Sequence, residues 1–151
     1  MPKEILAKAG FLVVTASTVP GDLSGKKNLT TAHVDITLDK VNSADYQGLM
    51  IVGGQRTFWY DETVLRLCRE FHAAGKLVAA ICISGAIPAQ AGLLRGRECT
   101  VFPDPAAIED IQKNGAVYVH QPVVVSGNII TADGPAAAEE FGQALVEFLS
   151  R

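Results

Sequence analysis

The sequence lacks an apolar run of the ~18 residues that a membrane-spanning helix requires. It also lacks a cluster of lysine or arginine, and its formal net charge of −3 is mild. These absences argue against a nucleic-acid or membrane-surface partner. Residues 1–11 form a charged, amphipathic segment without an apolar core, so no signal peptide is predicted and we expect a cytoplasmic protein.

Cysteine and histidine are scarce, with three residues of each. Cys68, Cys82 and Cys99 cannot all pair, and their spacing matches no zinc site, so we expect free thiols in a reducing compartment. No set of His, Cys, Asp and Glu has the spacing of metal ligands. No glycine-rich stretch has the spacing of a phosphate loop or a dinucleotide fingerprint. We therefore expect neither a metal nor an organic cofactor.

The chain of 151 residues is 48% hydrophobic and 19% charged, which is typical of one globular domain over residues 1–151. Apolar runs alternate with amphipathic segments. This alternation predicts an α/β sandwich, with a mostly parallel sheet and helices on both faces. Strands are expected over 11–17, 32–38, 48–54, 77–82 and 97–103, a helix ending at Gly10, further helices over 61–76, 84–94, 105–115 and 135–150, a loop over 19–28, and a β-hairpin over 116–134 that turns at 126–128.

The stretch VAAICISGA, residues 78–86, places a thiol where a buried strand meets small residues. In open parallel sheets the chemistry sits at the carboxyl ends of strands. A sharp strand-to-helix turn would lift the Cys82 side chain out of the sheet, and the following helix would lower the pKa of the thiol. The backbone N–H groups of Ile83 and Gly54 would then form an oxyanion hole. Core filling is the alternative, because free cysteine is often buried, and spacing alone leaves both interpretations open.

The other candidate residues are predicted to be structural. Cys68 lies on the apolar face of a helix and Cys99 lies within a strand. His33, His72 and His120 are scattered, and none is adjacent to Cys82 in sequence. A lone histidine is more often a surface or core residue than a catalyst.

Several segments together resemble the DJ-1/PfpI (ThiJ) superfamily. They are VGG at a strand end, GKLVAAIC before the turn, AGLLRGRECTVFP, VVVSGNIITADGP and AAEEFGQALVEFL, and the resemblance extends from Pro2 to Leu149. It implies a flavodoxin-like fold and a homodimer or higher homo-oligomer. It also implies that Cys82 is the reactive centre, with oxyanion N–H groups from Gly54 and Ile83.

The sequence departs from the family pattern in two places. Many members carry a histidine directly after the reactive cysteine, whereas this chain has Ile83, so the thiol must be activated by the helix dipole and a hydrogen bond. Family members also begin with a strand, followed by a loop whose glutamate bonds the cysteine sulfur. No residue here matches that glutamate, since Glu4 falls inside the helix that follows.

The first strand of a flavodoxin-like sheet lies between the second and third. Without it, the strands at 11–17 and 48–54 would be separated and two rows of backbone groups left unpaired. The sequence leaves three resolutions open: a rearranged sheet, a strand lent by a partner chain, or a longer native protein. If a partner chain lends the strand, we expect an altered dimer in which edge strands of the two chains pair.

Three alternative functions are compatible with these residues. The first is an enzyme whose Cys82 thiolate attacks a small carbonyl or amide compound, in hydrolase-, glyoxalase- or deglycase-like chemistry. The second is a redox-sensing or stress-response protein that acts through oxidation of Cys82 without turnover. The third is a non-catalytic scaffold kept for its fold.

Overall fold

The computed structural model describes residues 2–17, 21–24, 31–52 and 61–151. Its central sheet has the order β5–β6–β10–β9, formed by Gly48–Ile51, Leu77–Ile81, Ile129–Ala132 and Val123–Ser126. β5 and β10 both run parallel to β6, and β9 runs antiparallel to β10. The prediction of a mostly parallel sheet is confirmed.

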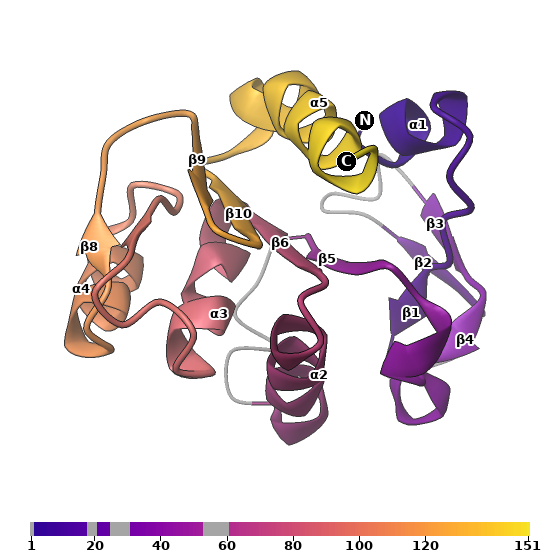
Figure 1. Ribbon diagram of the computed structural model, residues 1–151, viewed down its shortest axis with the longest axis horizontal. Helices are drawn as coiled ribbons and strands as arrows, with labels where there is room; N and C mark the ends of the chain where they lie inside the picture. Colours follow the sequence, from indigo (N-terminus) through magenta and orange to yellow (C-terminus); the bar gives the residue numbers. More distant parts are fainter. Residues whose placement is uncertain (1, 18–20, 25–30, 53–60) are drawn as a thin grey trace.

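Helices cover both faces of this sheet (Figure 1). On one face α1, Pro2–Lys8, packs beside α5, Ala138–Leu149. On the other face lie α2, Glu62–Ala73, and α3, Ala86–Gln90, with α4, Pro105–Lys113, packed against α3. Each face has its own apolar core: Phe71 is buried on the α2 side and Phe141 on the α5 side. This layering confirms the predicted α/β sandwich.

Local sequence explains the longer helices. Asp61 caps α2 by accepting a hydrogen bond from the backbone N–H of Val64 at 3.0 Å, as the sequence predicts. Asp104 caps α4 in the same way, and Pro105 occupies its first turn. No helix in the described ranges is both long and apolar enough to cross a membrane.

The predicted strand over 97–103 and the predicted hairpin over 116–134 are both shorter than expected. The strand over 97–103 is reduced to β7, Glu98–Cys99, and it pairs in parallel with β8, Val117–Tyr118. β8 is therefore not part of the hairpin over 116–134. The hairpin itself is confirmed over β9 and β10, and it turns at Gly127, where φ is +61°.

The N-terminal third differs most from prediction. The expected strand over 11–17 is wrong for most of its length, since only β1, Ala16–Ser17, is formed, and it pairs in parallel with β4, Ile36–Thr37. The expected strand over 32–38 is divided between β4 and β3, Thr31–Val34. Part of the predicted loop over 19–28 is β2, Gly21–Ser24, which pairs with β3. β1–β4 and β2–β3 are separate two-stranded sheets, so no rearrangement of the described strands joins β1 to β5.

Two single-turn 3₁₀ helices, Leu38–Lys40 and Ser43–Asp45, connect β4 to β5. The predicted strand over 48–54 ends at Ile51 within the described residues, and residues 53 and 54 lie outside them. In Figure 1 the β1–β4 region stands to one side of the central sheet, beyond β5.

Candidate functional site

A sharp turn follows the buried strand β6. Its five residues are all buried, and the strand ends at Ile81. Cys82 then has φ +66°, and among the described residues it is the one non-glycine residue with positive φ. This left-handed conformation costs about 1–2 kcal/mol for an L-residue. The chain therefore places the thiol in a strained conformation at the carboxyl end of a central strand.

The turn continues as a 3₁₀ helix over Cys82–Gly85 and then becomes α3. The helix predicted over 84–94 is thus shorter, since α3 has five residues and ends at Gln90. Cys82 packs at the margin of the α5-side core, whereas the side chain of Ile83 packs against the α2-side core. The elbow expected at Cys82 is present as a backbone feature.

Ser84 fixes the ends of two neighbouring strands under this turn. Its side chain is 2% exposed, and Oγ lies 2.7 Å from the carbonyl oxygen of Ile81 and 2.9 Å from that of Ile51. These oxygens are the last carbonyls of β6 and β5, and the hydroxyl donates its single proton to one of them at a time or shares it between both. The sequence indicates only that the residues after Cys82 are small, so the hydrogen-bonding role of Ser84 was missed.

Gly85 lets the turn approach the segment after β7. A Cβ on Gly85 would lie 2.8 Å from the carbonyl oxygen of Thr100, so a larger residue would force the turn away. The N–H of Thr100 donates to Oγ1 of Thr131 in β10 at 2.9 Å, which holds this segment against the sheet. The N–H of Phe102 then donates to the carbonyl oxygen of Cys82 at 3.2 Å.

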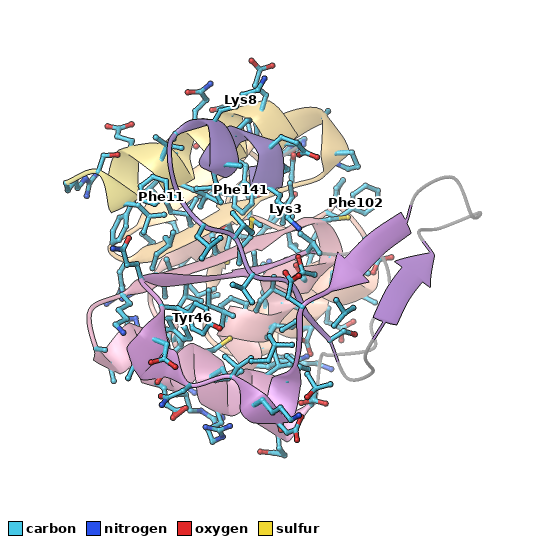
Figure 2. All side chains as sticks on the ribbon, turned by 90° about the vertical axis from the view of Figure 1, so that its right-hand side faces the viewer. Lys3, Lys8, Phe11, Tyr46, Phe102 and Phe141 are labelled. Carbon is cyan, nitrogen blue, oxygen red and sulfur yellow. The ribbon has the colours of Figure 1, made fainter. Side chains whose placement is uncertain are left out.

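Phe102, whose N–H bonds the carbonyl of Cys82, is 43% exposed. It also contacts Gly134, where a Cβ would lie 3.3 Å from the ring. Figure 2 shows Phe102 at the periphery of the molecule, away from Phe11. Its ring is therefore accessible at the same end of the sheet as Cys82.

The three thiols have different environments. Cys82 is half-buried, whereas Cys68 and Cys99 are fully buried, and all three are free. Burial raises the pKa of Cys68 to about 12 and that of Cys99 to about 11. Because the thiolate is the nucleophile, neither buried cysteine is suited to react near neutral pH. The predicted structural role of Cys68 and Cys99 agrees with this burial.

The remaining predicted site residues are only partly placed. Ile83 lies in the first turn after β6, where N–H groups lack intrahelical acceptors, and its role as an oxyanion donor stays a prediction. Gly54, the other predicted donor, lies outside the described residues. The residues that the structure describes form no hydrogen bond to Sγ of Cys82, and His120 instead stacks on Tyr118.

Groups of three or more His, Cys, Asp and Glu side chains arranged to hold a metal ion do not occur in the described part of the chain. Glu4 lies in α1, as the sequence predicts. Among the described residues, the turn after β6 brings together a half-buried thiol and backbone N–H groups.

Comparison with known proteins decides the family. The model of the DJ-1/PfpI family matches residues 1–148. The chain belongs to the DJ-1/PfpI family. The resemblance noted from the sequence is thus confirmed over nearly the whole chain.

Two curated relatives show the level of similarity. The chain is 36% identical over 153 residues to the uncharacterized protein MJ0967 of Methanocaldococcus jannaschii, a match that covers 99% of this chain and 74% of that protein. It is 34% identical over 137 residues to Deglycase PH1704 of Pyrococcus horikoshii, covering 89% of this chain and 81% of that protein. Both relatives match across most of their own length.

A solved structure supports the same assignment. The ThiJ/PfpI domain protein from Brachyspira murdochii superimposes with a TM-score of 0.93 at 30% sequence identity, covering 99% of this chain and 86% of that one. The fold of this DJ-1/PfpI member is therefore that of the family.

Proposed function

We propose that this DJ-1/PfpI protein is an enzyme with deglycase-like chemistry, in which Cys82 attacks small carbonyl compounds. The observation that carries the proposal is the half-buried thiol held at positive φ at the carboxyl end of β6. The similarity to Deglycase PH1704 supports the same chemistry. It also favours catalysis over the redox-sensing alternative.

The proposed step is the addition of a thiolate to a carbonyl. A lone pair of the Cys82 sulfur forms a bond to the carbonyl carbon, and the electron pair of the C=O bond moves to oxygen. The backbone N–H of Ile83 supports this oxyanion by donating a hydrogen bond. Protonation of the oxyanion by water gives a hemithioacetal, so no oxidant or reductant is required.

Methylglyoxal is a suitable small aldehyde for the test. The wild-type chain is expected to consume it, with uptake of one water, and to release lactate. Cys82→Ala is expected to abolish turnover, whereas Cys68→Ala and Cys99→Ala, in folded protein, are expected to retain it. Equal turnover in the Cys82→Ala variant would contradict the proposal. So would a wild-type chain inactive toward both methylglyoxal and amines glycated by it.

The cellular setting follows from the same residues. Three free thiols support a reducing compartment, and a cytoplasmic location is part of this proposal. The homodimer implied by the family resemblance stays a prediction, which light scattering on the purified protein would test.

A further inference from the structure

An exposed aromatic side chain belongs to the residue that bonds the turn after β6. The backbone N–H of Phe102 donates to the carbonyl oxygen of Cys82 at 3.2 Å, so the two backbones are in direct contact. Phe102 is 43% exposed and Cys82 is half-buried, so both side chains reach the surface. Among the described residues, Phe102 is a member of neither apolar core. Its ring is therefore not needed to fill the interior.

Strand register places Phe102 across the ends of two parallel strands. β6 ends at Ile81 and β10 ends at Ala132, and these two residues are paired in register. Cys82 follows β6 directly, and Gly134 follows β10 by two residues. Phe102 bonds the first of these positions through its N–H and covers the second with its ring. Because ligands of open parallel sheets bind at the carboxyl ends of the strands, the ring lies where a substrate of the thiol is expected.

Gly134 leaves the space that the ring occupies. This glycine is buried, and a Cβ built on it would lie 3.3 Å from Cδ2 and 3.7 Å from Cε2 of Phe102. Its φ of 165° is extended backbone that any residue adopts. A larger side chain would therefore be resisted by the ring and not by the backbone conformation. The ring thus has a defined position against Gly134.

The segment that precedes Phe102 is fixed on the sheet. Thr100 and Val101 are fully buried. The N–H of Thr100 donates to Oγ1 of Thr131 in β10 at 2.9 Å, and a Cβ on Gly85 would lie 2.8 Å from the carbonyl oxygen of Thr100. A ring on a backbone that is already ordered loses little conformational freedom when it contacts a ligand.

The chemistry of the ring selects the group that it can contact. A pair of aromatic rings is favoured beyond the area that it buries, by a factor of about two to ten in a binding constant. A methyl group makes no such pair, and a charged group loses hydration against an apolar surface. The phenylalanine ring has no polar atom, so its contribution is contact and not proton transfer.

We propose that Phe102 is a specificity-determining residue of the Cys82 site, whose ring contacts a planar apolar group next to the reacting carbonyl. The preferred substrate class is α-oxoaldehydes that carry an aryl group. The inference rests on the proposed thiol chemistry and adds the identity of this substituent. The sulfur adds to the aldehyde carbon and the carbonyl electron pair moves to oxygen, as for methylglyoxal. Phenylglyoxal with one water then gives mandelate.

Two matched alkylating agents test the contact without requiring turnover. The sulfur of Cys82 displaces bromide ion from the same CH₂–C=O group in 2-bromoacetophenone and in bromoacetone, which differ only in a phenyl or a methyl substituent. Rates at the Cys82 peptide of the full chain are measured by mass spectrometry and divided by the rates with N-acetylcysteine. The normalised phenyl-to-methyl ratio should be at least about two in the wild-type chain.

Three variants assign this ratio to the ring. Phe102→Leu keeps apolar volume but removes the flat ring, so the ratio should fall to about one, whereas Phe102→Tyr should retain it. Gly134→Ala displaces the ring and should also lower the ratio. Phe148→Leu is the matched control, because Phe148 lies in the last turn of α5 with the Arg151 guanidinium 5.3 Å from its ring, and it should keep the wild-type ratio.

Turnover separates this inference from the proposed function. Phe102→Leu should lower kcat/KM for phenylglyoxal by at least about twofold relative to kcat/KM for methylglyoxal. The phenyl preference in alkylation without turnover of either oxoaldehyde would contradict the proposed function while supporting the role of Phe102. A wild-type ratio near one, an unchanged ratio in Phe102→Leu, or an equal loss in Phe148→Leu would overturn the inference.

Discussion

The positive φ of Cys82 predicts that glycine is more stabilising than alanine at this position, whereas the opposite holds at Cys99. Cys82→Ala and Cys82→Gly both remove the thiol, but only glycine adopts φ +66° without steric cost. Glycine removes a steric cost of about 1–2 kcal/mol from the folded state. This gain is partly offset by about 0.4–1 kcal/mol, because glycine also increases the conformational entropy of the unfolded chain. Cys82→Gly should therefore be more stable than Cys82→Ala by about 1 kcal/mol.

Cys99 supplies the matched control. It is fully buried and does not have a positive φ. There Cys99→Gly should be less stable than Cys99→Ala by about 0.5–1 kcal/mol. Urea unfolding of the four variants measures both differences, and for a chain of this size 1 kcal/mol corresponds to about 2–4 °C in Tm.

The same order at both positions, with alanine more stable than glycine, would refute the argument that the turn holds Cys82 in a strained conformation. If glycine is more stable than alanine at Cys82 but not at Cys99, the native conformation of Cys82 lowers the stability of the fold while it projects the thiol. Such strain is characteristic of functional positions.

The buried hydroxyl of Ser84 bonds two strand-end carbonyls, so Ser84→Ala should cost about 1–3 kcal/mol in urea unfolding, whereas exposed Ser150→Ala should change stability by less than about 0.5 kcal/mol. Gly85→Ala should cost about 1–3 kcal/mol through overpacking, and it should change the rate of thiol alkylation by iodoacetamide. The raised pKa values of Cys68 and Cys99 mean that the unfolded chain loses these protons first. The free energy of unfolding should then fall as pH rises from about 9 toward 11, and replacing both cysteines with alanine should flatten that fall.

Elements with strong local signals were predictable from the sequence. Asp61 marks the start of α2, and the apolar face that follows is buried as expected. The hairpin turn next to Gly127 is equally local. Caps, amphipathic periodicity and turn residues act within a few positions, so they are legible without knowledge of the fold.

Residues 11–15 show what local signals leave out. The run FLVVT has high strand propensity, yet only Ala16–Ser17 forms a strand. A strand requires a neighbour, and Leu12–Val14 make no backbone hydrogen bond with any described residue. Propensity therefore describes what this segment can form, while pairing decides what it does form.

The thiol site was predictable in position but not in mechanism. The sequence located Cys82 at a strand end, because a buried apolar run stops at small residues. It did not indicate the positive φ, the hydroxyl of Ser84 beneath the turn, or the bond from Phe102. These features depend on distant segments that meet only in the folded chain.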